Sequence, residues 1–210
     1  MLEMLLSKKM NPELPPPTSL TIEGAGAPNT WTATSGVSLN GDGSYSFAGT
    51  TLDTLRIPYQ NTPFPTGEAV DIRLRAIVYT IYETTKPVYF LSKWAGATPG
   101  ENFYDFVLQR HTDGKLAYNV GSMSNNKFIT TATITLNKEF ELRWIVSKTG
   151  AFTLSMDGNV VGSGNLPAWR QSPLDWMIGS FLNAAQTAGT TNGARTNWKL
   201  IGLRVIRGKT

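Results

Sequence analysis

Closely spaced carboxylates are the first residues in this chain whose type could support chemistry. Two carboxyl groups held about 5–5.5 Å apart can act as nucleophile and general acid on a glycosidic bond. Glu139 and Glu141 would share one face of a strand, but Arg143 follows them there without a third carboxylate. Glu101 and Asp105 straddle a predicted loop-to-strand junction and need not converge. We therefore expect a solvated outer strand face at Glu139, and we predict no catalytic residues.

Nucleophilic and thiolate chemistry find no support in the composition. The chain has no cysteine, which excludes disulfides, thiolate metal sites and cysteine catalysis. Its one histidine, His111, precedes a Thr112-Asp113-Gly114 turn, where we expect a surface residue. A Ser-His-Asp triad and a histidine-rich metal site are therefore not expected, and no glycine-rich phosphate loop precedes a helix.

Two tryptophans are candidates for sugar binding, which needs an aromatic face beside a few hydrogen-bonding groups. Trp94 follows Lys93 and precedes a glycine-containing loop at 95–100. Trp169, Arg170 and Gln171 form the second candidate, near the polar segment 183–197. The alternative for Trp94 and Trp169 is burial or packing at an interface. By contrast, alternation predicts a core position for Trp144.

Segment 139–163 shows which elements must position these residues. Phe140, Leu142, Trp144 and Val146 alternate with polar residues, which is typical of a half-buried antiparallel strand. An Asp157-Gly158 turn then joins two further alternating runs, a strong hairpin signal. We predict strands at 20–23, 30–34, 45–47, 55–57, 70–82, 88–92, 103–111, 116–120, 128–134, 140–148, 151–156, 160–161, 176–179 and 198–207.

These strands predict one all-β domain, a two-sheet antiparallel jelly-roll sandwich at 19–210. A chain of 210 residues suits a single domain of this class, and strands of this number need two sheets to bury their apolar faces. Residues 1–18 are predicted to form an extended N-terminal arm, because Pro15-Pro16-Pro17 favours a semi-rigid spacer. Four apolar residues of this arm could dock on a partner protein: Leu2, Met4, Leu5 and Leu6. The alternative is a disordered leader.

Charge and hydropathy limit the partners and the compartment. The net charge is +4, and its densest basic patch is Lys199, Arg204, Arg207 and Lys209. We predict no nucleic-acid partner, because most aromatic residues fall at core positions; weak attraction to anionic surfaces such as lipopolysaccharide or acidic glycans fits the charge. We also predict no membrane insertion, because no segment has the roughly 20 apolar residues of a membrane helix. The N-terminus lacks the order of a secretory signal, so we expect no export.

Six segments occur in the order found in a known family of domains. They are LNGDGSY at 39–45, FLSKW at 90–94, FVLQRHTDGKL at 106–116, WIV at 144–146 with LSMDG at 154–158, LDWMIG at 174–179 and IGLRV at 201–205. Together, over about 36–208, they resemble the laminin-G-like jelly roll of the concanavalin A-like lectin/glucanase superfamily. The resemblance implies two curved antiparallel sheets whose concave face or rim loops often bind sugars or proteins. It implies no single activity, because one fold hosts many functions.

The resemblance also raises calcium, which relatives in this fold often hold through loop carboxylates and carbonyls. Asp42, in the Asn40–Ser44 turn, or Asp53 could supply oxygens. Turn geometry that needs a positive φ already explains the Asn-Gly-Asp-Gly sequence. We expect no cofactor, with calcium at Asp42 or Asp53 as the alternative.

These observations together predict a non-enzymatic surface protein of a bacteriophage virion, of the tail-fibre, tail-tip or capsid-decoration type. It would attach through its arm to other virion proteins, form a homo-oligomer and display the jelly roll for adhesion to a host-surface glycan or protein. Phage proteins that resemble this fold commonly do such work. The alternative is a carbohydrate-binding module or a glucanase-type glycoside hydrolase.

Overall fold

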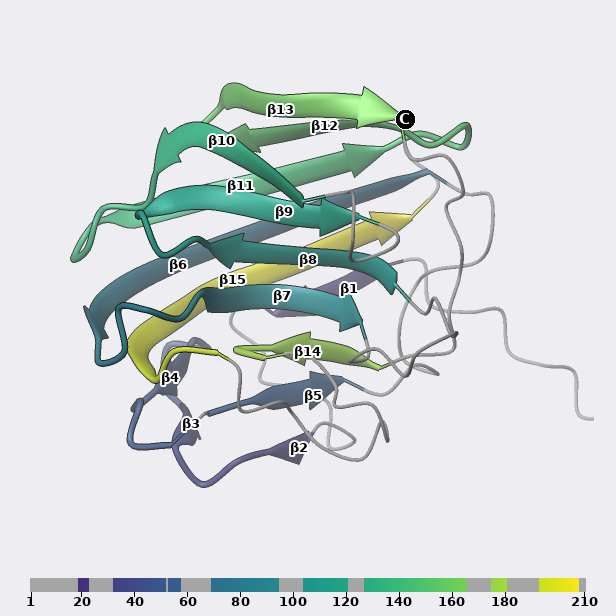
Figure 1. Cartoon of the computed structure of the whole chain (residues 1–210). Coiled ribbons are helices and arrows are strands. Elements are labelled where there is room, and N and C mark those ends of the chain that lie inside the picture. The colour runs from purple at the N-terminus through teal and green to yellow at the C-terminus, as the bar shows by residue number, and fades with distance from the viewer. Residues whose placement is uncertain are drawn as a thin grey trace, which may run out of the picture.

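The computed structural model is all-β, with two antiparallel sheets stacked face to face (Figure 1). It describes residues 19–22, 32–51, 53–57, 69–94, 104–120, 127–165, 175–180 and 193–207. Within these ranges there is no helix, and hence no helix that could cross a membrane. The predicted fold class is confirmed. The predicted arm at 1–18 lies outside the described residues.

The larger sheet has eight strands and carries the candidate site discussed below. Its order is β13 (Asn159–Asn165), β12 (Ala151–Met156), β11 (Glu139–Val146), β6 (Val70–Ile81), β15 (Thr196–Arg207), β4 (Tyr45–Phe47) and β3 (Val37–Leu39), and β1 (Ser19–Ile22) also pairs with β15. The two 12-residue strands β6 and β15 pair along their whole length. Beyond β15, β4 pairs with Trp198–Leu200 and β1 with Leu203–Ile206. Ile201 and Gly202 therefore lie between two different neighbours.

The second sheet has seven strands. Its order is β10 (Lys127–Thr133), β9 (Lys115–Val120), β8 (Tyr104–Arg110), β7 (Val88–Trp94), β14 (Trp176–Ile178), β5 (Leu55–Ile57) and β2 (Thr32–Ala33). Neighbouring strands often lie far apart in sequence: β14 pairs with both β5 and β7. Such crossovers are typical of a jelly roll.

Aromatic side chains fill the space between the two sheets. In β11 every second residue is buried, and Trp144 is only 1% exposed, which confirms its predicted core position. Phe106 of the seven-stranded sheet packs edge-on against Trp144 of the facing sheet, with ring centroids 4.9 Å apart, and against Trp176 of its own sheet, at 5.4 Å. Burying each such side chain stabilises the fold by about 2–3 kcal/mol.

The predicted turn and most predicted strands agree with the structure. Asp157 and Gly158 both adopt positive φ, 50° and 81°, which a tight two-residue hairpin turn requires. Strands β4, β5 and β12 have the predicted bounds. Two differences stand out: β3 was not predicted, and β13 extends to Asn165, well beyond the predicted 160–161. The Gly162-Ser163-Gly164 sequence carries no apolar alternation, so only its pairing with β12 reveals the strand.

Candidate functional site

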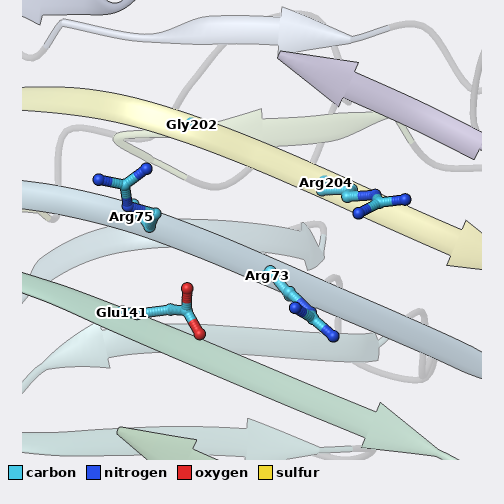
Figure 2. A pocket seen from close by; sticks show the side chains of 5 residues that line it. All are labelled: Arg73, Arg75, Glu141, Gly202 and Arg204. Atoms are coloured by element: carbon cyan, nitrogen blue, oxygen red, sulfur yellow. The ribbon is translucent and has the colours of Figure 1, made fainter. Parts of the chain in front are cut away.

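A hollow of about 290 Å³ opens on the outer face of the eight-stranded sheet. It is lined by Arg73 and Arg75 from β6, Glu141 from β11, and Gly202 and Arg204 from β15 (Figure 2). These strands are direct neighbours in the sheet, so residues far apart in sequence meet on one face. The outer face forms the site because the alternating residues Ile72, Leu74 and Leu203 point into the core.

The strand register arranges the site in two rows across the sheet. In one row Glu141 is opposite Arg75, and Arg75 is opposite Gly202. In the next row Arg143 is opposite Arg73, and Arg73 is opposite Arg204. Residues two apart along a strand are separated by about 6.6 Å, so the two rows lie side by side. The second row therefore places three arginines next to each other.

The hollow forms where β15 is irregular. The register with β6 shifts between Leu200 and Gly202, which indicates a β-bulge. Glycine at a bulge leaves the sheet face without a side chain. Gly202 is also the point at which the outer neighbour of β15 changes from β4 to β1. The sequence thus opens a depression between the arginines of β6 and Arg204.

Asp71 organises one end of the arginine row. Arg143 donates two hydrogen bonds to it, from Nε to Oδ1 at 3.0 Å and from Nη2 to Oδ2 at 2.8 Å. Arg73 reaches the same Oδ2 through Nη2 at 3.4 Å, a weaker contact. Burial raises the pKa of Asp71, but the hydrogen bonds from Arg143 and Arg73 more than offset this effect and leave the pKa below its usual value. Asp71 is therefore a carboxylate committed mainly to Arg143.

Arg75 is held by a second carboxylate at the edge of the hollow. Its Nε and Nη2 both donate to Oε1 of Glu139, at 2.9 and 2.6 Å. The two side chains are 42% and 45% exposed, so water screens the pair and its contribution to stability is small. It nevertheless limits the directions in which Arg75 can donate further hydrogen bonds.

Two guanidinium groups keep unused donors. Within the described part of the chain, Arg204 makes no ion pair or hydrogen bond, and it is exposed. Arg73 Nε lacks a partner there but is buried, so a ligand would meet the outer nitrogens of this side chain, which is 39% exposed and makes one weak contact with Asp71. The described residues of the site and its immediate neighbours include four arginines (Arg73, Arg75, Arg143 and Arg204) and three carboxylates (Asp71, Glu139 and Glu141). Their net charge is therefore +1. The hollow can donate hydrogen bonds to acceptor oxygens of a ligand.

The predicted sugar-binding tryptophans fall outside the part of the chain whose side chains the structure describes. Lys93 and Trp94 end β7 in the other sheet, opposite Phe106 and Tyr104, and their side chains lie outside the described residues. The second predicted group is not described at all: Trp169, Arg170 and Gln171. The same holds for the arm residues Leu2, Met4, Leu5 and Leu6.

The two aspartates predicted as calcium ligands accept hydrogen bonds from the chain itself. Lys199 Nζ donates to Oδ2 of Asp42 at 2.7 Å, and the Ser44 backbone N–H donates to its Oδ1 at 3.0 Å. These bonds, with that from Lys199 the largest, hold the pKa of Asp42 far below its usual value. Asp53 is buried and accepts from the Gly49 N–H at 2.7 Å and from the Thr51 hydroxyl at 2.8 Å. Within the described ranges, no three Asp, Glu or His side chains cluster as metal ligands.

Other sequence predictions find a clear place. Glu139, Glu141 and Arg143 lie on the outer face of β11, as their alternation predicted. His111 is half-buried at its turn, where Nδ1 lies 3.0 Å from Oδ1 of Asp113. The side chain of Asp105 is not described, and neither is Glu101.

Sequence reasoning did not assign the arginine hollow. A signal existed in two of the three strands, because charged residues alternate at Asp71, Arg73 and Arg75 in β6 and at Glu139, Glu141 and Arg143 in β11. In β15, Lys199 and Arg204 are five positions apart and show no such alternation. What the sequence did not supply was the pairing of β6 with both β11 and β15.

Comparison with solved structures supports the fold, whereas comparison with protein-family models and curated proteins gives no match. The carbohydrate recognition domain of Emp47p matches with a TM-score of 0.56 and 11% identity, covering 91% of this chain and 96% of that domain. The metal-free carbohydrate recognition domain of Emp46p gives a TM-score of 0.53 and 11% identity, covering 84% and 87%.

A mutant Trypanosoma rangeli sialidase that displays trans-sialidase activity also matches, with a TM-score of 0.61 and 8% identity. It is covered over only 30% of its length, against 89% of this chain. At such identities these similarities establish the fold alone. The resemblance to the lectin-type jelly roll is therefore confirmed at the level of architecture.

Proposed function

We propose that this chain is a non-enzymatic carbohydrate-binding module that uses the outer face of its eight-stranded sheet for adhesion. The observation that carries the proposal is the hollow over Gly202, lined by the exposed Arg204, whose guanidinium donors have no partner among the described residues. The fold that it shares with carbohydrate recognition domains supports this proposal.

The face beyond the hollow has the mixed character that a sugar needs. Along β6 the outward residues continue from Arg75 to Ile77 and the exposed Tyr79. Tyr79 lies close enough to Lys199 to contribute to raising its pKa, after the larger effect of the hydrogen bond to Asp42. An aromatic side chain beside charged donors can pack against a saccharide ring while the donors bind its oxygens.

The electrostatics of the described carboxyl groups support a binding role without catalysis. A glycosidase general acid needs a raised pKa. Each described carboxyl whose pKa departs clearly from its usual value has it lowered: Asp42, Asp71, Glu83 and Asp113. Glu139, the nearest carboxylate to Glu141 along β11, already accepts two hydrogen bonds from Arg75.

For the setting, we propose the surface of a bacteriophage virion, with residues 1–18 attaching the module to other virion proteins in several copies. The apolar residues of this segment and the resemblance of 36–208 to domains of such proteins support this role. Several weak sites on one particle would then gain by avidity. Deletion of 1–18 should abolish attachment or oligomerisation and leave the thermal unfolding of the jelly roll nearly unchanged; a large loss of stability would contradict this division.

A glycan array probed with the full chain tests the binding role. We expect specific glycans to bind, and Gly202→Val to abolish that binding by filling the hollow. Gly41→Val is the matched control, because a Cβ at Gly41 meets no atom within 4 Å. Circular dichroism checks the fold of each variant, and Glu141→Arg provides a second change, at a half-buried residue that lines the hollow.

Two outcomes would contradict the proposal. In the first, the array shows no glycan bound, or Gly202→Val and Glu141→Arg bind as the wild type does. In the second, the wild type hydrolyses a polysaccharide and Glu139→Gln or Glu141→Gln abolishes the activity, which would establish the glycoside hydrolase instead.

A further inference from the structure

The arginine row on β6, β11 and β15 carries more positive charge than the chain neutralises. Arg143, Arg73 and Arg204 lie opposite one another on three adjacent strands, and Asp71 is the one carboxylate bonded to this row within the described residues. Directly opposed side chains of antiparallel strands have Cβ atoms about 5 Å apart, and like charges in that arrangement destabilise the sheet. An anion between Arg73 and Arg204 would relieve this repulsion.

The two arginines also have donors in the right place. The closest contacts of Asp71 are to Arg143, while Arg73 reaches it through one nitrogen at 3.4 Å and its side chain is still 39% exposed. Arg204 keeps all its donors without a partner among the described residues. Guanidinium groups bind carboxylate, sulfate and phosphate oxygens through paired, charge-assisted hydrogen bonds.

We propose that the ligand of the hollow is an acidic polysaccharide whose carboxylate, sulfate or phosphate substituent is held by Arg73 and Arg204. This inference rests on the carbohydrate-binding function proposed above and names the class of glycan. The anionic group lies over the arginine row, and the sugar ring extends along the hollow toward Gly202 and Glu141.

Glu141 distinguishes a charged sugar from a bare polyanion. It lines the hollow beside Arg75, and its carboxylate would repel a second anionic group while accepting a hydrogen bond from a sugar hydroxyl. Among the described residues that line the hollow none is aromatic, whereas single-stranded nucleic acid is bound chiefly by stacking of its bases on aromatic side chains. One acidic group flanked by hydroxyls suits the site best.

Affinity measurements with the full chain test this inference. The probes are dextran sulfate, polygalacturonate and unmodified dextran. We expect at least one acidic polymer to bind tenfold or more tightly than dextran, and Arg204→Gln to weaken that binding about tenfold through loss of a charge-assisted hydrogen bond. Arg195→Gln is the control, because it removes the same charge from an exposed arginine outside the hollow that pairs with Glu83. It should change affinity by less than about twofold.

Several outcomes would overturn the inference while leaving carbohydrate binding intact: dextran or other neutral glycans binding as tightly as the acidic polymers, or equal losses for Arg204→Gln and Arg195→Gln. Inorganic polyphosphate, single-stranded DNA or anionic phospholipid vesicles competing as well as the acidic polymers would also overturn it, in favour of a general polyanion site. A chain that binds no polysaccharide, neutral or acidic, would contradict the proposed function itself.

Discussion

Asp42 in the β3–β4 turn and Asp53 after β4 are charged, as are Arg73 on β6 and Arg204 on β15, but the chain treats the two pairs differently. Asp42 and Asp53 accept hydrogen bonds from neighbouring backbone and side-chain groups, so their charges serve the local structure. Arg73 and Arg204 retain donors without partners in the described part of the chain. The comparison shows that residues of similar charge can differ in unused hydrogen-bonding capacity, and this difference is why we propose the arginines as the binding site.

The largest expected effect concerns the pair of aspartates. Asp53→Ala removes the acceptor of the buried Gly49 N–H and of the Thr51 hydroxyl. We expect a loss of about 3 kcal/mol in the free energy of unfolding, measured in urea, with unchanged affinity for polysaccharide in the folded fraction. Calcium should not raise the unfolding temperature of the wild type. If calcium raised the unfolding temperature of the wild type but not that of Asp53→Ala, Asp53 would be a metal ligand, and the contrast between the aspartates and the arginines would be wrong.

Asp71→Asn should affect both stability and binding, since Asp71 is buried beneath the arginine row. It leaves Arg143 without its paired acceptor, which should cost about 2 kcal/mol in urea unfolding. Arg73 also loses its one anchor, so affinity for polysaccharide should fall several-fold. Ser155→Ala, nearby on β12, serves as the control. If Asp71→Asn lowers stability alone, Arg73 has no part in the binding site.

The lowered pKa of Asp71 predicts the direction in which the stability of the fold changes with pH. The pKa of Asp71 is lower in the folded chain than its usual value of about 3.9, so the carboxylate stabilises the fold above that pH. This contribution is lost as the pH falls through the lower, folded value. Urea unfolding between about pH 6 and 2.5 should show the wild type losing stability below about pH 4. The difference in the free energy of unfolding between the wild type and Asp71→Asn should become smaller over the same range. A difference that stays constant would show that the Asp71 carboxylate does not have a lowered pKa in the folded chain.

The smallest effect is expected at the exposed pair on the rim. Glu139→Gln removes the partner of Arg75, and because both side chains are well exposed the free energy of unfolding should change by less than about 0.5 kcal/mol. The negative charge of Glu139 is then gone from the edge of the hollow, so an acidic polysaccharide should bind about two- to threefold more tightly. Weaker binding would place Glu139 itself in contact with the ligand.

The fold was largely predictable because its information is local. Trp144 and its alternating neighbours on β11 identified a half-buried strand, and Asp157-Gly158 identified a hairpin. The short strand β3 lacked a comparable pattern: two of its three residues, Ser38 and Leu39, are exposed, so only its pairing with β4 defines it.

The site was much less predictable, because it depends on non-local register. The sequence presented Lys199 and Arg204 as parts of one basic patch, yet Lys199 pairs with Asp42 while Arg204 faces the hollow. No periodicity shows that Arg204 lies opposite Arg73, 131 positions earlier in the chain. The bulge before Gly202, where β15 exchanges β4 for β1, is likewise a property of the assembled sheet.

The most direct test of the central claim is to map where a bound acidic polysaccharide perturbs the backbone amide resonances of the full chain. We predict that the largest changes cluster at 71–75, 139–143 and 200–204, on the three strands around the hollow. Changes centred instead on the 40–44 turn, or on the seven-stranded sheet, would show that the ligand binds elsewhere and would contradict the account.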